Sequence, residues 1–287
     1  MKIIHISDLH FPKKLPVLGL RGKAIVGYLN YRLRRNSKYP LRLVNDLVRT
    51  IQSLDYDALV ISGDLTNVSH PSEFLYAKEL LTPILDHRCF MIPGNHDRYQ
   101  KKAIGPNPLF ESVFGEWMGD TNDSDFYLRT KMIKKTLFVG WDSNSVLPIA
   151  KANGYVNEEV IQKTLDTIRT PYVLVCHHPI WNPKHQEESF GHRMTNRRTV
   201  VEKLKSNPPI LYLHGHTHTN WIKKKGESMP YWIVNSASST RLADRKHESG
   251  FHQISINSNI EFKRYLYQAG KFAEVNPILY EETDGVV

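Results

Sequence analysis

The chain has 287 residues, of which 40% are hydrophobic, and its formal net charge is +9. This length is enough for one large core, and no stretch approaches the ~20 apolar residues that cross a bilayer, which excludes an integral membrane protein. The apolar stretch at residues 2–6 is too short for a signal peptide, and Cys89 and Cys176 both lie in apolar runs. We therefore expect a cytoplasmic protein without disulfides.

Strands and helices are predicted to alternate along the chain. Short runs rich in Ile, Val, Leu and Phe predict buried strands at residues 2–6, 57–62, 88–92, 136–141, 171–176, 210–214 and 231–235. Between several of them, apolar residues recur at helical spacing, at residues 40–54, 72–85, 157–168 and 197–205. Residues 251–256 and 260–267 alternate apolar and polar side chains, which predicts a closing antiparallel hairpin. The pattern indicates an α/β fold.

The positive charge is concentrated in one segment, because residues 11–45 hold nine Lys or Arg and no Asp or Glu. Within it, a basic amphipathic helix is predicted by apolar residues at helical spacing, namely Leu20, Ala24, Ile25, Tyr28, Leu29 and Leu33. Such a helix either packs on the domain with a solvated charged face or contacts anionic lipid. We expect a single domain over residues 1–270, with residues 11–39 as a basic insert and residues 271–287 as a C-terminal tail.

Polar side chains follow five of the predicted strands at the point where each strand ends. They are Asp8 and His10, Asp64, Asn95-His96-Asp97, His177-His178, and the histidines 214, 216 and 218. Ligands in open α/β sheets bind beyond the carboxyl ends of strands, so these side chains are expected to lie together. Their oxygen and imidazole donors suit Mn, Fe, Zn or Co.

Five blocks occur in a fixed order: Asp8-x-His10, Gly63-Asp64, Gly94-Asn95-His96-Asp97, His177, and Gly215-His216-Thr217-His218. Together they resemble the signature blocks of the calcineurin-like metallophosphoesterase superfamily. The sequence departs from the common pattern at Ser7, where many members have Gly, and at Asn67, where Asp is frequent. Neither departure replaces a metal ligand. The resemblance implies a four-layer α/β/β/α sandwich with two mixed sheets flanked by helices.

The resemblance also implies two divalent metal ions, with Mn expected and Fe, Zn or Co as alternatives. The first ion would be held by Asp8, His10, Asp64 and His218. Asp64 would bridge to the second ion, whose other ligands would be Asn95, His177 and His216. His177 rather than His178 matches the family ligand. His214 is expected to support the site without binding metal.

Two cations about 3.5–4 Å apart can share a water and lower its pKa, and the bridging hydroxide is the expected nucleophile for a phosphodiester or pyrophosphate bond. By the same resemblance, His96 protonates the leaving oxygen and Asp97 orients the imidazole. The alternative is that His96 only hydrogen-bonds a phosphate oxygen. Substrate contacts, or solvated loop positions, are expected for Arg98, Tyr99, His192, Arg193 and Arg197.

The basic segment bears on the substrate, a phosphorylated small molecule or a lipid nucleotide. It resembles the Gly-Tyr-Leu-Asn insert of bacterial relatives that include UDP-2,3-diacylglucosamine pyrophosphatases of lipid A synthesis. This resemblance makes UDP-2,3-diacylglucosamine the lead substrate and would place residues 11–39 at the anionic inner face of the membrane. The alternative is a soluble cyclic-nucleotide or general phosphodiesterase, which the Ser7-Asp8-Leu9-His10 and His177-His178-Pro179 blocks also resemble. An interaction module without catalysis is disfavoured because every expected ligand is present. A nuclease is disfavoured because the charge is confined to one segment.

Overall fold

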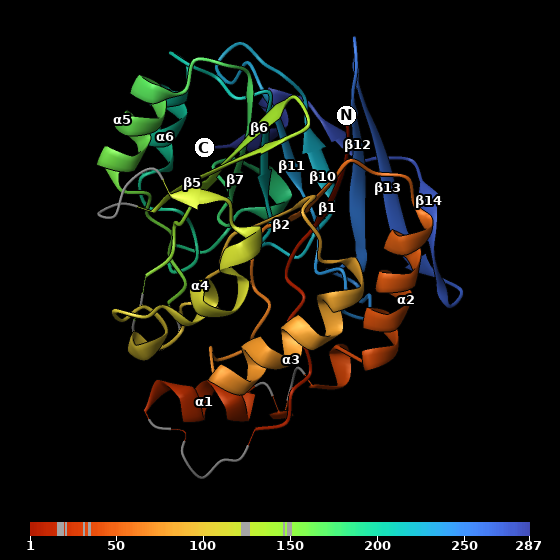
Figure 1. The fold of residues 1–287 in the computed structure, drawn as a ribbon. Helices are drawn as coiled ribbons and strands as arrows, with labels where there is room; N and C mark the ends of the chain where they lie inside the picture. Colours follow the sequence, from red (N-terminus) through yellow and green to blue (C-terminus); the bar gives the residue numbers. More distant parts are fainter. Residues whose placement is uncertain are drawn as a thin grey trace.

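The computed structural model of the protein describes residues 1–15, 20, 22–30, 32–33, 36–121, 127–145, 147 and 151–287. Two β-sheets pack face to face, and helices cover their outer faces (Figure 1). Both sheets are mixed. The predicted α/β/β/α arrangement is therefore confirmed.

The first sheet has the strand order β14-β13-β12-β1-β2-β3. Its parallel half consists of β1 (Lys2–Ile6), β2 (Ala58–Ile61) and β3 (Cys89–Met91), all fully buried apart from Lys2. Its antiparallel half consists of β12 (Gly250–Ile256), β13 (Ile260–Gln268) and β14 (Lys271–Val275). The hairpin predicted from the alternation is β12 and β13.

The second sheet has the strand order β15-β10-β11-β9-β7-β6-β5-β4. The central strands β6 (Thr136–Trp141), β7 (Tyr172–Cys176), β9 (Leu211–His214) and β11 (Trp232–Asn235) run parallel. The outer strands are β4 (Asp120–Thr121), β5 (Leu128–Ile133), β10 (Trp221–Lys223) and β15 (Leu279–Tyr280). A separate two-stranded ribbon joins β8 (Asn182–Pro183) to β16 (Gly285–Val286).

The segment expected to form a C-terminal tail is instead built into both sheets. Strand β14 begins at Lys271, β15 extends the second sheet beside β10, and β16 pairs with β8. Its strands are short and half-exposed, so the segment lacks the continuous apolar run that marks a buried strand in a sequence.

Helices cover the outer face of each sheet. Helices α2 (Leu41–Ser53), α3 (Pro71–Leu81) and α4 (Leu109–Phe114) share one core with the first sheet. Helices α5 (Glu158–Thr167) and α6 (Arg197–Leu204) share another with the second sheet. A third core between the two sheets includes Ile3, Val60, Phe90, Val173, Leu213 and Val234. Short 3-10 helices span Asn36–Lys38, Thr82–Ile84, Lys101–Ala103, Gly115–Trp117, Lys184–Gln186 and Glu282–Asp284.

The basic insert contains helix α1 (Lys23–Asn30), which lies at the end of the molecule opposite the N-terminus (Figure 1). The rest of the predicted helix falls partly outside the described residues, at 21, 31 and 34–35. Ala24 and Tyr28 are buried against Val68. Leu29 and Leu33, which we assigned to the apolar face, are exposed, as is Val26. None of the described helices has the length and apolar character needed to cross a bilayer.

Candidate metal centre

The predicted ligands come together where the parallel strands end. The loop after β1 is tied to the loop after β2, because the N–H of Asp8 donates to the Gly63 carbonyl oxygen at 3.0 Å and the N–H of His10 donates to that of Asp64 at 2.9 Å. The loop after β9 joins them, since the N–H of His216 donates to Oδ2 of Asp8 at 2.9 Å.

The backbone is strained at these ligands. Left-handed φ angles between 40° and 73° occur at Asp8, His10, Asp64, His216 and His218. Asp and His adopt this region more readily than most residues, but it still costs free energy. Gly94 is needed beside them, because a Cβ atom there would lie 2.4 Å from the Asp64 nitrogen. Five of the eight non-glycine residues with such angles in the described part of the chain are these ligands, and strain clustered in this way is typical of a functional site.

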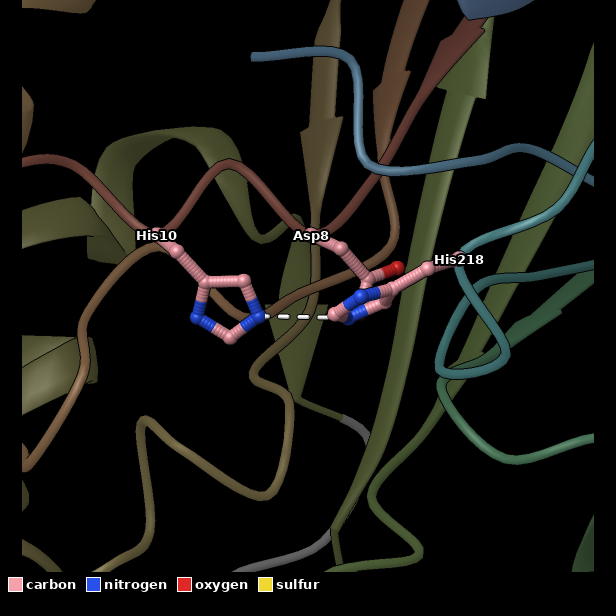
Figure 2. A group of neighbouring side chains, drawn as sticks. All are labelled: Asp8, His10 and His218. Atoms are coloured by element: carbon pink, nitrogen blue, oxygen red, sulfur yellow. Dashed lines mark hydrogen bonds and ion pairs between the residues drawn. The ribbon is translucent and has the colours of Figure 1, made fainter. Parts of the chain in front are cut away.

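One half of the centre consists of Asp8, His10 and His218, which point toward one another (Figure 2). Nε2 of His218 lies 3.2 Å from Oδ1 of Asp8 and 3.4 Å from Nε2 of His10. Oδ2 of Asp64 approaches the same His10 nitrogen at 3.6 Å.

The other half consists of Asn95, His177 and His216. Oδ1 of Asn95 lies 3.1 Å from Nε2 of His177 and 2.9 Å from Nδ1 of His216. Oδ2 of Asp64, the same oxygen that faces His10, lies 3.5 Å from Nε2 of His177. Oδ1 of Asp64 is instead held by the N–H of His96 at 2.7 Å. A single carboxylate oxygen therefore faces both halves.

The outward nitrogens of three imidazoles are hydrogen-bonded to backbone carbonyl oxygens. His10 uses Nδ1 toward Thr66 (3.0 Å), His177 uses Nδ1 toward Ser62 (2.8 Å), and His216 uses Nε2 toward its neighbour His192 (3.0 Å). A carbonyl oxygen can only accept, so these nitrogens carry the protons. In a neutral ring the inward nitrogen then presents a lone pair, which is how ligating histidines are oriented.

The electrostatics of the cluster favour cations. Burial opposes charge on Asp64, yet His177, His96 and His10 hold its pKa well below the usual range. Burial likewise opposes charge on His177, but the carboxylates of Asp64 and Asp8 outweigh it and raise the pKa of His177 to about 10. Oδ1 of Asp8 accepts no hydrogen bond within the part of the chain that the structure describes. Buried carboxylates with inward-facing imidazole nitrogens fit divalent metal ions.

The rings of His178 and His214 adjoin the cluster, but their hydrogen bonds go to groups outside it. The ring of His178 is hydrogen-bonded on both sides, at 2.8 Å from the Ser143 hydroxyl and 2.8 Å from the Ala152 carbonyl oxygen. His214 is buried against Trp221, with ring centroids 5.2 Å apart, and its Nδ1 contacts the Gly215 carbonyl oxygen at 2.9 Å. The geometry thus favours His177 over His178, and agrees with a supporting role for His214.

The Asp97 carboxylate, which we expected to orient the His96 ring, is hydrogen-bonded to groups of the neighbouring loops. The Asp97 carboxylate accepts backbone N–H groups of Leu65, Thr66 and Gly94 at 3.0–3.1 Å, and the Thr66 hydroxyl at 3.0 Å. The His96 ring uses Nδ1 toward the Asn67 carbonyl oxygen at 2.7 Å instead. Asp97 therefore fixes the loops around Asp64, and a backbone carbonyl orients the imidazole.

The five proposed substrate residues fall into different environments. Arg98, where we expected a substrate contact, is 3% exposed, and its guanidinium donates to both Asp142 (2.9 Å) and Glu111 (2.8 Å) in a buried ion pair. Arg197 is also buried, at 7% exposed. Arg193 lies over the ring of Phe190, at 4.8 Å. Tyr99 stacks on His96, and His192 lines a cavity over the centre.

A cavity of about 730 Å³ opens over the centre. The predicted residues Asp64, Asn95, His96, His192, His216 and His218 line it, together with residues that we did not predict: Ala152, Gln186, Glu188, Ser189, Thr217, Lys246 and His247. Most of the latter lie in loops outside any signature block, so the sequence carries no local signal for them. Only Thr217, between two ligands, could have been included.

Comparison with known proteins agrees with this geometry. The sequence profile of the calcineurin-like phosphoesterase family matches residues 1–220. The chain belongs to this family. It is a metal-dependent phosphoesterase, and family members use two divalent metal ions.

Individual relatives are distant. A "probable cyclic nucleotide phosphodiesterase" from Ruthia magnifica subsp. Calyptogena magnifica is 24% identical over 218 residues, which cover 74% of this chain and 82% of that protein. A dimetal phosphatase from Danio rerio has a TM-score of 0.58 at 14% identity, covering 92% of this chain and 94% of that one. A purple acid phosphatase from yellow lupin (Lupinus luteus) seeds has a TM-score of 0.57 at 12% identity, covering 99% and 54%. The two solved structures show that the fold is shared.

Proposed function

We propose that the protein hydrolyses a phosphodiester bond with two divalent metal ions, Mn²⁺ in the first instance. One ion would be held by Asp8, His10, Asp64 and His218. The other would be held by Asn95, His177 and His216, and it would share Asp64 with the first. The observation that carries the proposal is Oδ2 of Asp64, which faces both halves of the centre at 3.5–3.6 Å from their imidazole nitrogens on the floor of an open cavity.

When bound, such a pair of ions supplies a nucleophile at neutral pH and neutralises charge at phosphorus. The chain's own residues hold and orient the reactants. Asp64 and Asp8 bring two negative charges against two divalent cations, and Asn95 adds an oxygen ligand without charge, so the loaded site stays positive and attracts a phosphate. Hydrogen bonds between the loops hold these groups in place before substrate arrives, which lowers the entropic cost of reaction.

We assign protonation of the leaving oxygen to His96, which lines the cavity beside Asp64. Its Nδ1 is hydrogen-bonded to the Asn67 carbonyl oxygen, so Nε2 is the nitrogen that can exchange a proton with a substrate. The imidazole rings of His96 and His10 meet edge to face, with centroids 4.8 Å apart. A group in this position contributes about 10²–10⁴-fold to the rate.

A cyclic nucleotide is our first substrate candidate. The relative from Ruthia magnifica carries that name, and the cavity volume of about 730 Å³ falls within the ~300–1,000 Å³ typical of small-molecule sites. Asn95, Gln186, Ser189 and Lys246 provide polar groups for a ribose or a base.

UDP-2,3-diacylglucosamine is the second candidate, because α1 and the residues that follow it expose apolar side chains and one basic side chain. Val26, Leu29 and Leu33 are 48%, 42% and 80% exposed, and Arg32 is exposed between the last two. A basic segment with exposed apolar side chains can bind an anionic membrane surface peripherally. The helix also reaches the site, since a Cβ atom on Gly27 would lie 2.6 Å from the hydroxyl of Tyr99, which stacks on His96.

The deciding experiment compares Mn²⁺-dependent hydrolysis of bis-p-nitrophenyl phosphate, cyclic AMP and UDP-2,3-diacylglucosamine, with EDTA as control and with anionic vesicles present or absent. Cleavage of cyclic AMP that vesicles leave unchanged supports the first candidate. Vesicle-enhanced cleavage of the lipid nucleotide, lost in a Leu29→Ser/Leu33→Ser variant, supports the second. Metal-independent cleavage, or none of any substrate by Mn²⁺-loaded protein, would overturn the proposal.

A further inference from the structure

Glu188 is a buried carboxylate beside the centre that belongs to no signature block. It lies in the loop after β8, and among the residues lining the cavity it is the one acidic side chain besides Asp64. Its side chain is only 6% exposed. Oε1 lies 3.2 Å from Nε2 of His216, while Oε2 accepts a hydrogen bond from Nδ2 of Asn182 at 2.9 Å.

The contact is made on the outward side of the His216 ring. Nε2 donates to the His192 carbonyl oxygen at 3.0 Å, and Nδ1 points inward to Oδ1 of Asn95 at 2.9 Å. The carbonyl thus fixes which nitrogen carries the proton, and the Glu188 carboxylate places a negative charge next to that proton. A charge there polarises the ring and makes Nδ1 a stronger donor to a cation.

Glu188 is held in this position from behind. Asn182, which donates to it, is completely buried, and its backbone is paired with Val286 of β16. Gly285 fits β16 closely against Trp181, since a Cβ atom there would lie 2.1 Å from the indole. The Asn182 amide that holds the carboxylate therefore stands on backbone that is paired with another strand.

Burying this charge has a cost, and the described positive charge that acts on it is the Arg197 guanidinium. Oε1 is buried and accepts no hydrogen bond from any described residue. An underpaired buried carboxylate is unfavourable unless a positive charge lies nearby. Its neighbour Glu187 differs in each respect, because its side chain is 51% exposed and its ion pair with Arg197 is 3.9 Å long.

We propose that Glu188 is a positioning residue that raises the affinity of the Asn95–His177–His216 half of the centre for its metal ion. The inference rests on the proposed function, in which those three residues bind the second ion. Glu188 acts through His216, and a negative charge in direct contact with the His216 ring is the property that matters.

The test is calorimetric titration of the metal-free protein with Mn²⁺, which counts the ions and gives an affinity for each. Glu188→Gln keeps the size of the side chain and its contact with Asn182 but removes the charge. We expect it to weaken the second Mn²⁺ about 10–100-fold and to leave the first unchanged. Glu187→Gln, one residue away, is the matched control and should bind both ions as the unaltered protein does.

The melting temperature of each metal-free variant shows whether it is folded. Should Glu188→Gln unfold, Glu188→Asp retains the charge on a shorter arm and is expected to bind the second ion with an intermediate affinity. The role of Glu188 would be overturned if folded Glu188→Gln, or Glu188→Asp in its place, bound two ions with unaltered affinity. That result would leave the proposed function standing. An unaltered protein that binds fewer than two ions would overturn the proposed function instead.

Discussion

The ring of Tyr99 stacks on the imidazole of His96, with centroids 5.8 Å apart and planes 12° from parallel. The other end of Tyr99 contacts Gly27 in α1. The basic insert and the proposed general acid are therefore connected through one aromatic side chain. A change in α1 can thus reach His96 without touching a metal ligand.

Gly27→Ala is expected to lower kcat about tenfold. The added methyl group would lie 2.6 Å from the Tyr99 hydroxyl and 3.0 Å from Val68, so the stacked ring must move and His96 with it. Alanine itself favours helix over glycine by about 1 kcal/mol, so lost helicity cannot explain the effect. Steady-state kinetics measures the change in kcat, and the metal content per chain is determined for each variant. The adjacent Val26→Ala, at a site 48% exposed, should be silent, and equal kcat in both variants would refute the connection.

Asp97→Asn is expected to lower the free energy of unfolding by about 2 kcal/mol or more. The carboxylate now accepts hydrogen bonds from backbone N–H groups. The amide would turn its NH₂ group toward some of these donors, which leaves them buried without an acceptor. Urea denaturation measures the loss, with Asp55→Asn, whose side chain is 82% exposed, as control. Unchanged stability with a loss of kcat alone would restore the idea that Asp97 serves the His96 ring.

Arg98→Ala is expected to destabilise the protein by about 3–5 kcal/mol, because it leaves the carboxylates of Glu111 and Asp142 buried without their cation. Urea denaturation checks this value, and the exposed Arg42→Ala should change stability by less than about 0.5 kcal/mol. KM, measured where the variant is still folded, should stay the same. A higher KM at unaltered stability would show that Arg98 binds substrate after all.

His252→Gln is expected to reduce the loss of stability in acid. Burial, aided by Arg264, lowers the pKa of His252 to about 3, whereas an unfolded histidine titrates near 6.5. Between these two pKa values the folded state binds fewer protons than the unfolded state. The contribution of His252 to the free energy of unfolding is therefore complete above pH 6.5. It is lost as the pH falls toward 3, at up to about 1.4 kcal/mol per pH unit. Urea unfolding at pH 7 and at pH 5 measures the difference. Parallel pH profiles for variant and parent would contradict it.

The strands and most helices could be predicted because each is encoded locally. The run at 171–176 became β7 (Tyr172–Cys176), and the pattern at 157–168, which begins with the cap Asn157, became α5. Ligand positions were also accessible, since signature blocks occur at strand ends. Glu188 could not be found in this way, because its importance depends on Asn182 and on a strand about a hundred residues further along the chain.

The role of Asp97 was misjudged for a related reason. Adjacency to His96 in the sequence does not determine where a carboxylate points. In this turn its side chain reaches back to the loop that carries Asp64, and the His96 ring points toward Asn67. The exposed Leu29 and Leu33 show a similar limit, since helical spacing identifies an apolar stripe but not the surface that covers it.

Five of the seven proposed ligands have a left-handed backbone, each at a cost on the order of 1 kcal/mol. Together these costs approach the whole net stability of an ordinary domain. Metal ions that bind only this backbone arrangement would offset them. The loops around the centre should therefore be the first part of a metal-stripped chain to exchange their amide hydrogens, well before the sheets on which they stand.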